Sequence, residues 1–342
     1  MDAPGAQEYD RMQKIPKIFV RPAEELVEDL NHKRVQIEVP VIDLGGLDKA
    51  DRHKQIAEEV RTASETWGFF QVVNHGIPLN VLDGMLDGIQ KFNEQDVEEK
   101  KKYYTRDNTR RVRFMTNHDL FRSRTANWRD TLTISFSDPD QSDSKELPDS
   151  CRKSTVEYSK HVWELGNILF GLLSEALGLK PEQLRNMDCS KGQRLTCHYY
   201  PACPEPELAL GIAKHSDPGF LTVLLQNQIN GLQIFFQNQW VDVQPIRGAL
   251  VINIGDLLQL VSNGKFRSNK HRVVANRLGP RISVACFFSG PINMDKVFYG
   301  PIEELISEEN PPIYKEVLLS DYLMKFIAAG LDDNFLVNYF KE

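Results

Sequence analysis

Hydrophobic and polar residues repeat with two different periods along the chain, and the period changes near residue 192. In the first part, Ile56, Val60, Ala63 and Trp67 recur at helical spacing, which predicts a helix over 51–67. The same reasoning predicts strands over 39–44, 68–73, 112–115 and 131–136, a helix over 81–92, and a long amphipathic helix over 154–177 that Gly178 stops.

Short β-type runs separated by turn residues fill the second part of the chain. They cover 195–200, 219–225, 231–236, 240–243, 249–254, 272–275 and 281–288. This spacing is typical of an antiparallel sandwich or barrel. From Ile302 onward the pattern returns to helix, with Tyr322, Phe326 and Ile327 on one side. The order predicts an α+β fold: a double-stranded β-helix (jelly-roll) core with N-terminal helices and strands and a C-terminal helical cap.

The chain of 342 residues is long enough for one large domain or two closely packed ones. We expect an N-terminal region of helices and strands packed on the barrel over 1–145, followed by a long scaffold helix over 146–190. The jelly-roll core is expected over 191–292 and the helical cap over 293–342.

Composition and charge exclude several classes of protein. The formal net charge of −7 argues against nucleic acid as a partner. Residues 1–12 lack the pattern of a signal peptide, and the most apolar stretch, 248–261, falls short of a membrane span. The five cysteines form no C-x-x-C pair, which favours scattered reduced thiols over a disulfide framework or a zinc site. These features favour a cytoplasmic protein with no membrane partner, and we expect it to be a monomer.

Candidate metal chemistry begins at Lys214-His215-Ser216-Asp217, where His215 and Asp217 stand two residues apart at the start of a predicted β-run. Residues i and i+2 of a strand project to one face, so this imidazole and carboxylate can converge. His271, at the head of another run, can supply a third ligand across the barrel. Two histidines and one carboxylate are the ligands used for non-haem iron(II), with three positions left for co-substrates. The H-x-D pair alone is weak evidence, because the chain has eight histidines.

Arg281 and Ser283 strengthen the interpretation. They share one face of the predicted strand that begins ten residues after His271. The rest of that run is apolar, so Arg281 is expected to be buried, and a buried guanidinium needs an anion. A guanidinium beside a hydroxyl suits the distal carboxylate of 2-oxoglutarate.

These residues resemble a known family, the plant 2-oxoglutarate/Fe(II)-dependent dioxygenases. The matching segments are 67–78 (WGFFQVVNHGIP), 199–204 (YYPACP), His215-x-Asp217, His271 and Arg281-x-Ser283, in the order and spacing of the family. The resemblance extends from about Val39 to Pro291. Segments 197–207 and 253–259 resemble the branch that holds the aminocyclopropane-carboxylate oxidase homologues and deacetoxyvindoline 4-hydroxylase.

The resemblance implies specific roles. His215, Asp217 and His271 would be the catalytic metal ligands, with Fe(II), 2-oxoglutarate and O2 as cofactor and co-substrates and ascorbate as reductant. Arg281, Ser283 and Tyr200 would bind 2-oxoglutarate, and Phe287 matches a position that packs on substrate in relatives. His198 stands where many relatives have asparagine. Two roles therefore stay open for it: it lines the active site, or it supports the residues that do. Phe114, in the polar segment over 105–150, is a further candidate for the substrate pocket, and a position on a surface loop is an equally favoured alternative.

The implied reaction is hydroxylation of a small, ring-containing specialised metabolite with release of succinate and CO2. Retention of Asp217 favours it over halogenation, because related halogenases have a small residue there; desaturation and O-demethylation stay open. Two alternatives also remain: an ascorbate-dependent aminocyclopropane-carboxylate oxidase, and a non-catalytic small-molecule sensor on the same fold. Asn253 and Asp256 are interpreted as residues that organise a turn rather than bind metal.

Overall fold

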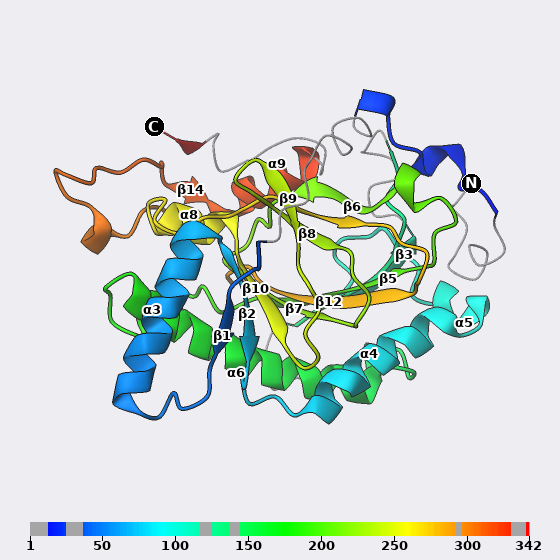
Figure 1. The fold of residues 1–342 in the computed structure, drawn as a ribbon, viewed down its shortest axis with the longest axis horizontal. Helices are drawn as coiled ribbons and strands as arrows, with labels where there is room; N and C mark the ends of the chain where they lie inside the picture. The colour runs from blue at the N-terminus through cyan, green and yellow to red at the C-terminus, as the bar shows by residue number, and fades with distance from the viewer. Residues whose placement is uncertain are drawn as a thin grey trace.

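An eight-stranded sheet forms the central layer of the molecule (Figure 1). The computed structural model describes residues 13–24, 37–116, 125–136, 144–291, 296–329 and 340–341. In spatial order the strands are β1 (Val41–Asp43), β2 (Phe69–Val73), β10 (Leu250–Ile254), β7 (Leu221–Gln226), β12 (Arg281–Phe288), β5 (Gln193–Tyr200), β4 (Asp130–Ser135) and β3 (Val112–Thr116). Strands β1 and β2 are parallel, and the other neighbours are antiparallel.

A four-stranded antiparallel sheet covers one face of this large sheet. Its order is β6 (Leu210–His215), β11 (His271–Val274), β8 (Leu232–Phe236) and β9 (Gln239–Asp242). Phe69 and Val251 from the large sheet pack with Ile212, Ile234 and Val273 from the small one. The two packed sheets form the jelly-roll core, which confirms the predicted fold class.

Three long helices cover the other face of the large sheet (Figure 1). They are α3 (Ala50–Thr66), α4 (Leu79–Glu94) and α6 (Arg152–Ala176). Each presents one apolar stripe to the core, as Ile56 and Val60 do in α3 and Leu165 and Leu169 do in α6. The remaining helices and strands are η1 (Lys17–Phe19), α5 (Val97–Lys101), η2 (Ser144–Glu146), α7 (Gln183–Asn186), η3 (Pro206–Leu208), α8 (Asp256–Val261), β13 (Phe298–Tyr299), η4 (Glu303–Leu305), β14 (Val317–Leu318) and α9 (Leu319–Ala329).

The long helix α6 lies very close to β12. A Cβ atom at Gly166 would stand 2.2 Å from the Phe288 ring, so only glycine permits this packing. Gly178 has a φ of +79° just beyond the helix, the left-handed conformation that glycine tolerates, and the predicted stop at this position is confirmed.

Two sequence predictions of secondary structure were wrong. Residues 210–215 form strand β6, which was not predicted, because Gly211 and Lys214 interrupt its apolar pattern. The helix expected from Ile302 begins only at Leu319; before it lie η4, irregular segments and β14. Tyr322 on α9 is fully buried, as predicted for one side of that helix. The side chain of Ile327 and residues 1–12 lie outside the described residues.

The five cysteines are all buried and unpaired, and none of the described helices is long and apolar enough to cross a membrane. Cys197 and Cys286 project from the large sheet into the apolar core on its helix-covered face, and Cys151 and Cys189 belong to the same core. Burial raises the pKa of the Cys197 thiol well above its ordinary value and that of Cys286 to about 12, so both thiols are protonated at neutral pH.

Candidate metal centre

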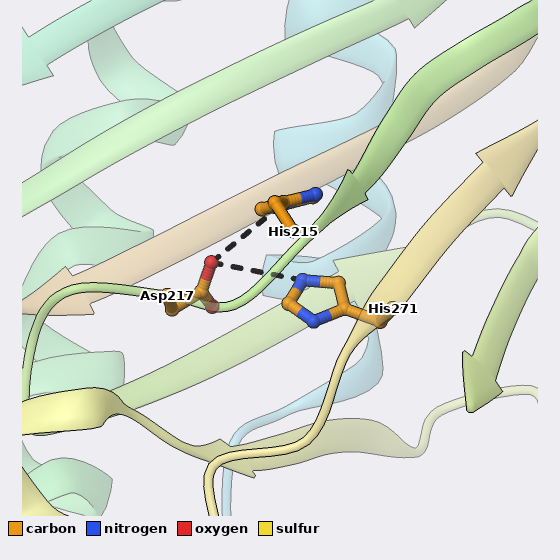
Figure 2. A group of neighbouring side chains, drawn as sticks. All are labelled: His215, Asp217 and His271. Atoms are coloured by element: carbon orange, nitrogen blue, oxygen red, sulfur yellow. Dashed lines mark ion pairs between the residues drawn. The ribbon is translucent and has the colours of Figure 1, made fainter. Parts of the chain in front are cut away.

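His215, Asp217 and His271 converge between the two sheets (Figure 2). Asp217 Oδ1 lies 3.7 Å from His215 Nε2 and 3.6 Å from His271 Nε2. The two imidazole centroids are 4.2 Å apart, and one donor atom from each residue falls within 4.8 Å of the others. The three side chains are mostly buried and could hold one metal ion on their shared side.

The local backbone explains how the ligands meet. His215 and His271 are directly opposite each other in the β6–β11 pair. His215 is the last residue of β6 rather than part of a strand that includes Asp217, so the expected i, i+2 geometry is corrected: Asp217 lies in the loop beyond the strand. His271 heads β11 as predicted.

Backbone carbonyls fix the imidazole tautomers. His215 Nδ1 is 2.8 Å from the carbonyl oxygen of Ala213, and His271 Nδ1 is 3.3 Å from that of Asn269. A carbonyl only accepts, so Nδ1 of each ring carries the proton and donates it. This leaves the Nε2 lone pairs directed at the site, which is the form that binds a divalent metal.

Two side chains from the large sheet orient the carboxylate. Asp217 Oδ2 accepts hydrogen bonds from Thr222 Oγ1 at 2.6 Å and from Asn253 Nδ2 at 2.8 Å. The other oxygen is left for a metal. Asn253 belongs to strand β10 and supports Asp217, so interpreting it as a turn residue was wrong. The role of Thr222 was not predicted, because its contact with Asp217 depends on how the loop after β6 meets strand β7.

Electrostatics favour the metal-binding forms. Burial acts to raise the pKa of Asp217, but attraction to His271 and His215 and the two hydrogen bonds outweigh it, so the pKa lies below the ordinary value. Burial and the neighbouring His271 charge lower the pKa of His215 to about 3. A carboxylate beside a neutral imidazole suits a divalent cation such as Fe(II).

A second buried acid braces the loop that carries Asp217. Asp256 accepts hydrogen bonds from Ser216 Oγ at 3.0 Å and from Tyr322 Oη at 2.9 Å, and its own N–H donates to the Asp217 carbonyl oxygen at 2.8 Å. Burial raises its pKa to about 6. Asp256 thereby connects the candidate metal site to the C-terminal helix α9.

Arg281 is fully buried without a carboxylate partner among the described residues. Its Nη2 donates to Gln226 Oε1 at 2.8 Å, and its Nη1 lies 3.4 Å from Ser283 Oγ. The guanidinium carbon is 5.0 Å from the centroid of the Tyr200 ring. Arg281 Nε and Tyr200 Oη make no hydrogen bond within the described structure. This cluster of unused donors fits the distal carboxylate of a bound 2-oxo dicarboxylic acid.

The other predicted residues fall on different faces of the sheet. His198 pairs with Ser283 and lies on the inner face, where its Nδ1 is 3.1 Å from Thr131 Oγ1. Phe287 is also on this face and partly exposed. Phe114 is not: it packs against Phe92 of α4, with ring centroids 5.2 Å apart, on the helix-covered face. The structure therefore separates Phe114 from the other candidates.

A jelly roll with two histidines, a carboxylate and a nearby buried arginine defines the class of mononuclear non-haem iron oxygenases. Comparison with known proteins identifies the family. Residues 191–290 match the 2OG-Fe(II) oxygenase superfamily, and residues 39–154 match the N-terminal region of the non-haem dioxygenase in morphine synthesis. The chain belongs to the 2-oxoglutarate/Fe(II)-dependent oxygenase family.

Similar proteins include 1-aminocyclopropane-1-carboxylate oxidase homolog 7 of Arabidopsis thaliana, 47% identical over 96% of this chain and 94% of that protein. Deacetoxyvindoline 4-hydroxylase of Catharanthus roseus is 50% identical over 96% of this chain and 83% of that protein. The crystal structure of JOX2 in complex with 2OG, Fe and JA is 28% identical, with a TM-score of 0.86, covering 100% of this chain and 98% of that one.

The comparisons confirm the predicted resemblance, jelly-roll fold and enzyme class. The protein is a 2-oxoglutarate-dependent dioxygenase with Fe(II), 2-oxoglutarate and O2 as cofactor and co-substrates, and its substrate is a small molecule.

Proposed function

We propose that the protein hydroxylates a small specialised metabolite that contains a ring, with oxidation of 2-oxoglutarate to succinate and CO2. The observation that carries the proposal is the pairing, on one inner face, of the His215–Asp217–His271 set with the buried and unpaired Arg281. Bound Fe(II) would supply the activation of O2 that this chemistry needs. The relative named as a 4-hydroxylase supports hydroxylation as the outcome.

The proposed roles of the metal ligands follow from their hydrogen bonds. His215 and His271 present Nε2 because their Nδ1 atoms face carbonyl oxygens. Asp217 presents Oδ1 because Thr222 and Asn253 engage its other oxygen. This preorganisation holds the ligands in place before the metal arrives.

The proposed co-substrate site lies at the Arg281 end of strand β12. Arg281 would bind the distal carboxylate of 2-oxoglutarate through its free donors, with Ser283 and Tyr200 adding hydroxyl groups. Gln226 positions the guanidinium by accepting from Nη2. Ascorbate is proposed as a reductant that keeps the metal in the Fe(II) state.

Anaerobic titration tests this function. Metal-free protein is given Fe(II) and then 2-oxoglutarate, and a weak visible charge-transfer band is expected. The band should be absent in Asp217→Ala and should require much higher 2-oxoglutarate in Arg281→Met. Arg277→Ala is the matched control, because Arg277 is exposed and pairs with Glu207.

Failure of the test would have a distinct meaning. A protein that binds iron but forms no band with 2-oxoglutarate would contradict the assignment. Product formation with ascorbate in place of 2-oxoglutarate would then identify an aminocyclopropane-carboxylate oxidase type of enzyme. Tight binding of a metabolite without turnover would identify a sensor.

A further inference from the structure

Two further arginines, Arg194 and Arg113, lie on the inner face of the large sheet, far along the strands from Arg281. Arg194 of β5 pairs directly with Phe287 of β12, and Phe287 pairs with Thr222, which donates to Asp217. Arg281 is six residues from Phe287 on the same strand, or roughly 20 Å along it. Arg194 therefore lies level with Thr222, which contacts the proposed metal ligand Asp217. It lies far along the strands from Arg281, the proposed anchor of 2-oxoglutarate.

Arg113 of β3 faces the same way. It pairs with Thr133, which pairs with Thr196, two residues along β5 from Arg194. Arg113 is 7% exposed, and its charge is close enough to lower the pKa of Arg194. Two guanidinium groups are thus directed to one region of the inner face.

Neither arginine has an acidic partner within hydrogen-bonding distance among the described residues. Arg194 contacts the Phe287 ring, with its guanidinium carbon 5.5 Å from the centroid, and makes no hydrogen bond there. Arg113 Nη1 donates to the neutral amide oxygen of Asn108 at 2.5 Å, and its Nε makes no hydrogen bond.

The acids whose charges reach these arginines are committed elsewhere or are exposed. Burial lowers the pKa of Arg194, Arg113 lowers it further, and Asp217 acts to raise it. Asp217, however, faces the two histidines and accepts from Thr222 and Asn253. Burial lowers the pKa of Arg113, and the fully exposed Asp107 offsets this in part. Two like charges in a region of low dielectric are unfavourable unless an anion binds between them.

We propose that Arg194 and Arg113 bind the anionic group of the primary substrate, so that the substrate is an organic acid rather than a neutral or cationic compound. This inference rests on the proposed function, which brings the substrate to this face. Arg194 supplies a planar fork that suits a carboxylate, and Phe287 beneath it offers a ring surface for an apolar part of the same molecule.

Binding measurements test the proposal without relying on turnover. Anaerobic protein loaded with Fe(II) and saturating 2-oxoglutarate is titrated calorimetrically with benzoate, cinnamate and 1-naphthaleneacetate and with their carboxamides. The acids should bind at least about tenfold more tightly than the matched amides, because a charge-assisted hydrogen bond is lost with the charge. Arg194→Gln should remove this preference, Arg113→Gln should reduce it, and Arg277→Gln should leave it unchanged.

The visible 2-oxoglutarate band separates the two possible failures. When the band forms, three results would refute the anion site and leave the proposed function standing. The amides bind as tightly as the acids, no acid of the panel binds at millimolar concentration, or Arg194→Gln keeps the preference for the acids. If the unmodified protein binds iron and forms no band, the proposed function itself has failed.

Discussion

The two faces of the eight-stranded sheet are built from the same strands but do different work. On β12, Ile282, Val284 and Phe288 project into the apolar core beneath α4 and α6. The alternate residues Arg281 and Ser283 project between the two sheets. The helix-covered face is apolar throughout this strand, whereas the inner face of the same strand carries the charged and hydroxyl groups of the candidate site. Substitution of a residue that faces the helices should therefore lower the stability of the fold. Substitution of its neighbour on the inner face should mainly change ligand binding.

The adjacent residues Phe288 and Phe287 give the strongest contrast in stability. Phe288→Ala is expected to lower the free energy of unfolding by about 3–5 kcal/mol, because the ring is fully buried and packs edge-on against Phe170 at 5.7 Å. Phe287→Ala, on the inner and partly exposed side, should cost roughly 1 kcal/mol. Denaturant unfolding measures both, and comparable losses would contradict the division between the faces.

Arg281 should show the reverse behaviour. Arg281→Met is expected to weaken 2-oxoglutarate binding by about 2–5 kcal/mol, since the carboxylate loses its charged partner. The melting temperature without ligand should stay level or rise, because a buried and unpaired charge is removed. Calorimetric titration and thermal unfolding check the two halves. A large drop in melting temperature would mean that Arg281 supports the fold rather than the ligand.

The residues that hold Asp217 should affect metal binding without affecting stability much. Thr222→Val keeps the shape of the side chain but removes its 2.6 Å hydrogen bond to Asp217, and Fe(II) affinity is expected to fall about 10- to 100-fold. Anaerobic metal titration measures it. Thr196→Val is the control on the same face, because Thr196 makes no hydrogen bond to Asp217. An equal effect in both variants would argue against a specific orienting role.

The smallest effect belongs to a pH-dependent contact between helices on the covered side. His53 of α3 lies 2.9 Å from Glu175 of α6, and this hydrogen bond raises the pKa of His53 above 6.5 although burial opposes it. Its contribution to stability is therefore complete below the unfolded-state pKa and is lost as pH rises through the higher folded-state pKa. Both side chains are about one-third exposed, so we expect only a few tenths of a kcal/mol.

Comparison of unfolding free energies at about pH 6 and about pH 8.5 checks this contact. The unmodified protein should lose slightly more stability than His53→Gln over that interval. An identical loss in the two proteins would show that the ion pair contributes nothing.

The sequence predicted the three long helices α3, α4 and α6 and most strands, because their apolar periods are regular. The short helices α7 and α8 were not predicted, and the start of α9 was placed too early. It also identified the three residues that converge at the candidate metal site. An H-x-D pair followed by a histidine and then by R-x-S is a combination that few other kinds of site would explain. Strand β6 was missed because Gly211 and Lys214 break the pattern, and with it the true position of Asp217 beyond the strand end.

Residues whose role depends on pairing between distant strands could not be predicted. Gln226 and Arg281 are 55 positions apart and meet only through the β7–β12 register. The error on Phe114 has the same origin: β3 reads Val-Arg-Phe-Met-Thr and is buried on both sides, so polarity alone does not say which side chains face inward. Its pairing with β4 directs Met115 and Arg113 to the inner face, and it directs Phe114 to the helix-covered core.

The location of the cysteines determines which sulfur atoms are exposed to oxidative damage. Cys151, Cys189, Cys197 and Cys286 lie in the helix-covered core, on the far side of the sheet from the proposed oxygen chemistry, and the thiols of Cys197 and Cys286 are held in their protonated, unreactive form. Damage by stray oxidants follows thiolate character and access, so these sulfurs are protected. Among the sulfur-containing residues on the described strands of the large sheet, Met115 is the one whose side chain projects to the inner face. Oxidative damage from repeated catalysis is therefore expected to form methionine sulfoxide at Met115 before it reaches the thiols of Cys197 and Cys286.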